Sequence, residues 1–261
     1  MHTFAIVNRK GGVGKTTTAV NLAYVLATSC NLRVLLIDAD GQANATQILL
    51  PTGEYAGLGA LLRGTVICYD ELIEHTDVPG LDGVPAGADL WALDLELVTG
   101  DRGRCYRALR SMRLALTEDG AYDIVIMDCP PNLSAACVSA ILASDAIIIP
   151  VLSDACSATG VAELVEQIDS LRSIQPELRV AGVLVNQWHR CPVVEDSVAY
   201  LREEGRVPVY DTVIRRTDKV PESSWARMAL QAWSPFCAAA RDYRAWVAEL
   251  LEREGIHYGE S

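Results

Sequence analysis

The chain has 261 residues, a formal net charge of −12 and a hydrophobic fraction of 50%. This length suits a single domain, which we expect to span residues 1–261, and the apolar half of the sequence can build a sizeable core. With 21% charged residues, wholesale disorder is excluded. No apolar run approaches the roughly 20 residues of a membrane-spanning helix, and the run at residues 4–7 is too short for a signal peptide. We therefore expect a cytoplasmic protein.

The eight cysteines are scattered, and no two of them have the spacing of a zinc ribbon or a thioredoxin-like site. We expect reduced, mostly buried thiols. The acidic net charge argues against nucleic-acid binding over the whole surface, although a local basic face stays possible. Only three of the 22 basic residues are lysines, and two of these, Lys10 and Lys15, lie close together near the N-terminus.

Short apolar, β-branched runs alternate with helix-like stretches along the chain. Several runs are continuously apolar, which is typical of strands covered on both faces. The predicted strands are residues 4–8, 33–38, 81–85, 123–128, 146–150, 180–186 and 207–214. The predicted helices are residues 15–29, 103–117, 134–143, 158–174, 194–204 and 236–254. This order predicts an α/β fold, with a mostly parallel, twisted sheet and helices on both faces. Residues 51–90 are less regular and are predicted to form loops and short helices.

The first predicted strand leads directly into a glycine-rich loop, KGGVGKTT at residues 10–17, and then into a helix. Glycines let consecutive backbone N–H groups turn towards a phosphate, and the helix presents its positive dipole end to the same anion. Lys15 is expected to reach the β- and γ-phosphates, and the Thr16 hydroxyl to bind Mg²⁺. The strict phosphate-loop pattern begins with glycine, but Arg9 stands at that position.

This loop is the deviant Walker A motif, and the chain resembles the ParA/MinD group of P-loop ATPases. Three further segments resemble the ParA side. They are DADGQANAT at residues 38–46, DCPPNL at 128–133 and TVIRRTDKVPES at 212–223. Gly41 stands where this family usually has proline. The motif begins at residue 10, so the resemblance is to the short, Soj-like form, and it implies a partition ATPase that uses ATP and Mg²⁺.

The resemblance implies a role for each polar residue of these motifs. Asp40 would orient the attacking water, while Asp38 and Asp128 would hold the metal together with Thr16. Lys10 would cross a dimer interface to the partner's nucleotide. A second group would bind the nucleotide: Lys10, Gly11, Gly12, Val13, Gly14, Lys15, Thr16, Thr17 and Asn186. For Asn186, at a strand end, hydrogen bonding to an adenine edge and satisfying nearby backbone groups are both open.

The resemblance also implies an ATP-dependent homodimer that binds double-stranded DNA without sequence specificity and is stimulated by a ParB-like centromere-binding protein. The candidate DNA contacts are Arg190, Arg215, Arg216 and Lys219. The arginines that some relatives carry near the start of the last helix are absent, because Phe236 and Ala238 stand there. Residues 186–227 contain seven basic and seven acidic residues, so composition alone does not support DNA binding. ATP-bound protein would then associate with the bacterial nucleoid.

Two other functions fit the same ATPase chemistry. One is a ParA-like ATPase that positions a cargo other than DNA. The other is an ATPase that cycles on a membrane like MinD, which requires a basic amphipathic C-terminal helix. The segment at residues 247–257 is acidic, so anionic lipids would repel it, and we expect no membrane binding.

Overall fold

Seven strands form one sheet in the computed structural model, which describes residues 1–66, 68–87, 90–96, 101–152 and 157–258. The strand order is β3-β4-β2-β5-β1-β6-β7, and all neighbouring pairs are parallel except β3 and β4. The strands are β1 (His2–Ile6), β2 (Val34–Asp38), β3 (Glu74–His75), β4 (Leu81–Val84), β5 (Ile124–Asp128), β6 (Ala146–Leu152) and β7 (Arg179–Asn186). The predicted α/β fold with a mostly parallel sheet is confirmed.

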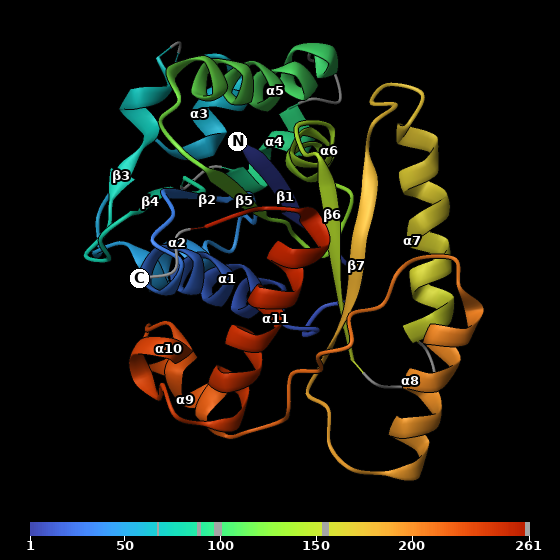
Figure 1. Ribbon diagram of the computed structural model, residues 1–261. Helices are drawn as coiled ribbons and strands as arrows, with labels where there is room; N and C mark the ends of the chain where they lie inside the picture. Colours follow the sequence, from blue (N-terminus) through green and yellow to red (C-terminus); the bar gives the residue numbers. More distant parts are fainter. Residues whose placement is uncertain (67, 88–89, 97–100, 153–156, 259–261) are drawn as a thin grey trace.

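Helices cover both faces of this sheet (Figure 1). The helices are α1 (Lys15–Ser29), α2 (Asn44–Leu49), α3 (Gly57–Arg63), α4 (Leu93–Glu96), α5 (Arg102–Asp119), α6 (Ala135–Leu142), α7 (Ser157–Leu171), α8 (Pro192–Glu204), α9 (Lys219–Trp225), α10 (Leu230–Trp233) and α11 (Ala238–Glu254). Two short 3₁₀ helices span Tyr69–Leu72 and Leu90–Ala92. The six predicted helices correspond to α1, α5, α6, α7, α8 and α11, and α3 lies in the region predicted to hold short helices, whereas α2, α4, α9 and α10 were not predicted.

Alternate residues of the central strands enter two separate hydrophobic clusters. In β2, Leu35 and Ile37 face the cluster that includes α5, α6 and α7, while Val34 and Leu36 face the cluster that includes α1 and α11. Side chains alternate between the two faces of a strand, so a strand buried on both faces must be apolar at every position. This explains the continuous apolar runs of the sequence.

Among the described helices, none is long and apolar enough to cross a membrane.

The strand predicted at residues 207–214 is wrong. This segment lies beside β7, but it forms a single isolated bridge, Val183 to Val209, and its amides at Tyr210 and Ile214 donate to the Val183 and Val185 carbonyls. Pro208 has no N–H to donate, and the amides of Asp211 and Thr212 donate to the Glu249 carboxylate on α11, at 2.7 and 2.9 Å. Between these bonds to β7, the segment turns the amides of Asp211 and Thr212 towards helix α11, so no regular strand forms.

Gly182 in β7 permits the closest packing along this edge. A Cβ atom at this position would lie 2.6 Å from Cε2 of Tyr210, which is fully buried. The Tyr210 ring also packs edge-on against Trp246 of α11, with 5.7 Å between ring centroids. The glycine thus lets the ring connect the sheet to the C-terminal helix.

We expect Gly182→Ala to lower the free energy of unfolding by about 1–3 kcal/mol, because the added methyl group overpacks a filled site. The matched control is Gly160→Ala in α7, where a Cβ atom would have nothing within 4 Å. That change should leave stability unchanged or raise it by up to about 1 kcal/mol, as alanine favours helices over glycine. Chemical denaturation measures both effects, and equal effects of the two changes would contradict this packing role.

Candidate nucleotide-binding site

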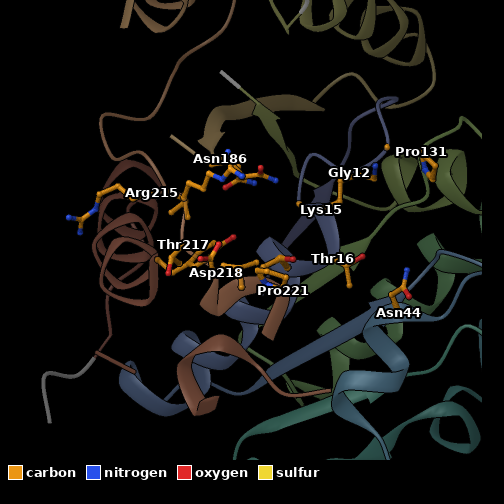
Figure 2. A pocket seen from close by; sticks show the side chains of 18 of the residues that line it. Gly12, Lys15, Thr16, Asn44, Pro131, Asn186, Arg215, Thr217, Asp218 and Pro221 are labelled. Carbon is orange, nitrogen blue, oxygen red and sulfur yellow. The ribbon is translucent and has the colours of Figure 1, made fainter. Parts of the chain in front are cut away.

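The carboxyl ends of the central strands open into a cleft of about 590 Å³. Its walls come from the glycine-rich loop after β1, the loop after β2, the end of β7 and the segment that leads into α9. Figure 2 shows Lys15 and Thr16 on one side of the cleft and Thr217 and Asp218 on the other. Parallel sheets place ligands at this edge, where loops from several strands converge.

The glycine-rich loop has the backbone conformation of a phosphate-binding loop. Gly12 and Gly14 have φ angles of 73° and 88°, which only glycine adopts at low cost. Helix α1 begins at Lys15 and has no acidic residue in its own first turn, so its sequence places no negative charge at the positive dipole end. Together the backbone N–H groups and the helix dipole favour an anion at this place.

Gly14 also permits a side chain to tie the loop to the far strand. A Cβ atom on Gly14 would lie 2.8 Å from Nδ2 of Asn186 at the end of β7. That nitrogen donates to the Val13 carbonyl at 2.8 Å and to the Thr18 hydroxyl at 3.2 Å. Among the described residues, Oδ1 of Asn186 has no hydrogen-bond partner although it is buried. The amide therefore satisfies backbone with its nitrogen and keeps its oxygen available to accept a hydrogen bond, so both predicted roles of Asn186 are compatible with its geometry.

Lys15 is folded back across the loop. Its Nζ donates to the Lys10 carbonyl at 3.0 Å, and the side chain is almost fully buried. Burial lowers the pKa of Lys15, while the negative charges of Asp128 and Asp40 act in the opposite direction. When a phosphate binds, Lys15 can release the Lys10 carbonyl and donate to a phosphate oxygen instead, which forms a stronger, charge-assisted hydrogen bond.

Asp38 and Asp128 form a buried carboxylate pair beside this lysine. They end the neighbouring strands β2 and β5 in register with each other, and their exposed fractions are 2% and 0%. Asp38 accepts hydrogen bonds from the Thr46 backbone N–H at 2.8 Å and hydroxyl at 2.7 Å. Neither oxygen of Asp128 has a hydrogen-bond partner among the residues that the structure describes.

Burial is the main cause of the perturbed pKa values of this pair. It raises the pKa of Asp38 to about 6, against hydrogen bonds from Thr46 that lower it. It also raises the pKa of Asp128 well above its usual value, with the charge of Asp38 adding to the effect and the charge of Lys15 opposing it. A buried carboxylate pair in which Asp128 has no hydrogen-bond partner among the described residues attracts a cation, which fits the predicted metal role of Asp38, Asp128 and Thr16.

Thr46 is one residue of this site to which the sequence analysis assigned no role. Besides donating to Asp38, its hydroxyl oxygen accepts from the Ala86 N–H at 3.1 Å. It thereby links the end of β2 to the loop after β4. The signal was present in the sequence, because Thr46 closes the motif that starts at Asp38, but the eight-residue separation gave no indication of contact.

Asp40 is half-buried at the mouth of the cleft. Its Oδ1 accepts from the Gln42 N–H at 3.0 Å, and its own N–H donates to Asp38 at 3.1 Å. The side chain thus lines the cleft from a loop that Asp38 holds in place.

Lys10 and the two glycines after it lie on the exposed edge of the loop. The Lys10 N–H donates to Asn8 Oδ1 at 2.9 Å. A Cβ atom on Gly11 or Gly12 would meet nothing within 4 Å among the residues that the structure describes, which leave this edge open.

The four predicted DNA contacts lie in different electrostatic environments. Arg215 forms a forked ion pair with Asp242, with distances of 2.6 and 2.9 Å, and Lys219 pairs with Glu222 at 2.7 Å. Arg190 and Arg216 are exposed, and no ion pair involves either side chain within the described parts of the chain. The basic charge available to an external anion is therefore smaller than the sequence suggested.

The cysteines that the structure describes are free thiols, and four of them are buried: Cys30, Cys105, Cys129 and Cys137. Cys156 lies outside the described residues. No group of three or more histidine, cysteine or acidic side chains suited to a metal ion occurs among the described residues. A cation at Asp38 and Asp128 would therefore need ligands from a bound molecule and from water.

We expect the metal-free protein to become less stable as pH rises from about 4 to about 6. The folded state holds the Asp38 proton, with a pKa of about 6, more tightly than the unfolded state, whose value is 3.8. Asp128→Asn should raise the free energy of unfolding at pH 7 in the presence of a chelator, because it removes a buried charge that the folded state disfavours. Asp123→Asn is the control of opposite sign, because Arg33 lowers the pKa of Asp123. A loss of stability in Asp128→Asn would contradict the claim that the Asp128 carboxylate destabilises the metal-free protein.

Comparison with known proteins agrees with this site. Residues 1–180 match the protein family described as AAA domain. The chain is 36% identical to the chromosome partitioning protein ParA of Caulobacter vibrioides, over 97% of this chain and 95% of that protein. It is 34% identical to the chromosome-partitioning ATPase Soj of Thermus thermophilus, over 95% of each.

A solved structure agrees as well. It is cobyrinic acid a,c-diamide synthase of Mycobacterium smegmatis with bound ADP and magnesium, which superimposes with a TM-score of 0.81 at 27% identity and covers 98% of this chain and 96% of that one. The motifs, the fold and the relatives all indicate the same family: the chain belongs to the ParA family of P-loop partition ATPases.

Proposed function

We propose that this protein is an ATP-dependent molecular switch that partitions DNA. It binds ATP and Mg²⁺ in the cleft, dimerises, associates with DNA and hydrolyses ATP slowly until a ParB-like partner stimulates it. The observation that carries this proposal is the buried pair of Asp38 and Asp128 beside Lys15, at the end of a glycine-rich loop. Magnesium and a triphosphate together would supply the charges that this arrangement leaves uncompensated.

The chain's own residues divide the work on the triphosphate. The N–H groups of residues 11–17 and the dipole of α1 bind the phosphate oxygens, and Lys15 neutralises charge at the β- and γ-positions. Mg²⁺, when bound, neutralises further phosphate charge. Thr16 supplies its hydroxyl to the metal, while Asp38 and Asp128 hold it through water. Asp40 orients the attacking water from its loop, and Asn186 accepts from the adenine amino group through Oδ1.

Dimerisation follows from the open edge of the loop. Lys10 extends to the nucleotide of the second copy, so each triphosphate is neutralised by both subunits. Loss of the γ-phosphate removes the anion that Lys10 contacts, and the dimer loosens. The space that the described residues leave at Gly11 and Gly12 supports this arrangement, since it can admit the second copy's backbone.

Arg190 and Arg216 are the leading candidates for DNA contacts, because they are exposed and unpaired within the described residues. Non-specific binding to duplex DNA depends on neutralising phosphates and releasing their counterions. Arg215 and Lys219 would first have to leave Asp242 and Glu222. The resulting protein would be cytoplasmic, and nucleoid-associated when it carries ATP.

A second candidate is the positioning of a cargo other than DNA. It is favoured by the ion pairs of Arg215 and Lys219, which remove half of the predicted basic contacts from the surface charge. In that case the ATP dimer would dock on a protein scaffold, and the nucleotide chemistry would be the same.

We expect the two lysines of the loop to separate binding from dimerisation. Lys15→Ala should abolish ATP binding, because a phosphate charge then stays uncompensated in a partly buried site. Lys10→Ala should bind ATP as a monomer and fail to form the ATP dimer. Titration with a fluorescent ATP analogue and light scattering after gel filtration measure the two properties. A dimer of Lys10→Ala would show that Lys10 does not act across the interface.

We expect ATP-dependent binding to random-sequence duplex DNA that weakens steeply as salt rises. The Asp40→Ala protein, in which hydrolysis is slowed, holds the dimer for this measurement. Changing both Arg190 and Arg216 to alanine should reduce the slope of log affinity against log salt by about 2, one for each lost phosphate contact. Lys219→Ala is the control and should change the slope less. A stable ATP dimer without DNA binding would favour the cargo function.

A further inference from the structure

A second hollow, of about 370 Å³, lies next to the nucleotide cleft on the side of Asp40. Its walls are the loop after β2, the loop before α6, and the helical turns at residues 90–94. Asp40, Gln42 and Pro131 line both this hollow and the nucleotide cleft, so the two are continuous. Pro131 appears beyond Gly12 in Figure 2, at the loop end of the cleft.

The helical turns at residues 90–96 pack on the core with one side and expose apolar side chains on the other side. Leu90 and Leu93 are buried in the core, and Asp94 Oδ1 accepts from the Ala135 N–H at 2.7 Å at the start of α6. On the outer side, Trp91 is 73% exposed and Leu95 is 76% exposed. A firmly held segment that exposes two large apolar side chains four residues apart is typical of an interaction surface.

The backbone of Trp91 touches the loop that carries Asp40. A Cβ atom on Gly41 would lie 3.1 Å from the Trp91 nitrogen and 3.2 Å from its Cα. This contact gives a physical reason for glycine at position 41. A larger residue at position 41 would press against Trp91, so the loop of Asp40 and the position of Trp91 depend on each other.

We infer that Trp91, together with Leu95, is an apolar anchor for a second copy of this chain in the nucleotide-dependent dimer. The inference rests on the proposed function, which already places a second copy over the open edge at Gly11 and Gly12. The hollow extends that same face through Asp40 and Pro131 as far as Trp91. In an interface with two-fold symmetry, the same patch is buried on both subunits, so the dimer would cover two copies of Trp91.

A tryptophan in the core of an interface contributes far more than its neighbours to the binding free energy. We therefore expect Trp91→Ala to raise the dissociation constant of the dimer by about tenfold or more, measured with a non-hydrolysable ATP analogue and Mg²⁺. Its affinity for the nucleotide as a monomer should be unchanged. Sedimentation equilibrium measures the dimer, and a fluorescent analogue at low protein concentration measures the monomer.

Trp225 provides a matched control. It is 92% exposed at the end of α9, and it lines neither the cleft nor the hollow. Trp225→Ala should therefore leave the dimer unchanged. Trp91→Phe should keep most of the dimer and lose the blue shift of tryptophan emission that burial of Trp91 produces. Gly41→Pro, which displaces the Trp91 backbone, should weaken the dimer in the same direction as Trp91→Ala.

The outcomes separate the inference from the function on which it rests. An analogue-dependent dimer that Trp91→Ala leaves intact, or that Trp225→Ala weakens equally, overturns the role of Trp91 and keeps the proposed switch. Absence of any analogue-dependent dimer in the unaltered protein overturns both. Thermal unfolding of each variant, followed by circular dichroism, distinguishes a weakened interface from a damaged fold.

Discussion

The buried carboxylates Asp38 and Asp128 impose the constraint on which the site depends. Two charged groups at the ends of adjacent strands, with exposed fractions of 2% and 0%, are costly unless a cation lies beside them. Lys15 compensates only part of this charge, because it is itself desolvated and donates to a backbone carbonyl. The site therefore suits a phosphate ligand that brings a metal cation with it. Without the metal, the buried carboxylates lower the stability of the folded protein at neutral pH.

The sheet order brings these groups together. β2 and β1 both flank β5, so the end of β5 places Asp128 between Asp38 and the glycine-rich loop. On the other side of β1, β6 and then β7 carry the sheet to Asn186, whose amide holds the Val13 carbonyl. Asn186 thus contacts the glycine-rich loop from a strand that lies far away in the sequence, and Gly14 is small enough to allow this contact.

Surface charge illustrates how folding changes the meaning of a residue type. The sequence presents Arg190, Arg215, Arg216 and Lys219 as equivalent basic residues, but folding brings Asp242 of α11 against Arg215 and turns Glu222 towards Lys219. Exposed ion pairs contribute little to stability, so these two can still exchange partners. They nevertheless reduce the electrostatic potential that an approaching polyanion meets.

The sequence by itself determined the fold class, six of the strands and the identity of the phosphate loop, because these depend on local periodicity and on glycines at fixed spacing. It could not determine that residues 207–214 bond to β7 without forming a regular strand, since the amides of Asp211 and Thr212 donate to Glu249 on a distant helix. The partners of Thr46, the two hydrogen bonds of the Asn186 nitrogen and the contact between Gly41 and Trp91 were likewise decided only by the tertiary structure. Each joins segments that no local pattern relates, and burial at their junction sets the pKa values on which the chemistry depends.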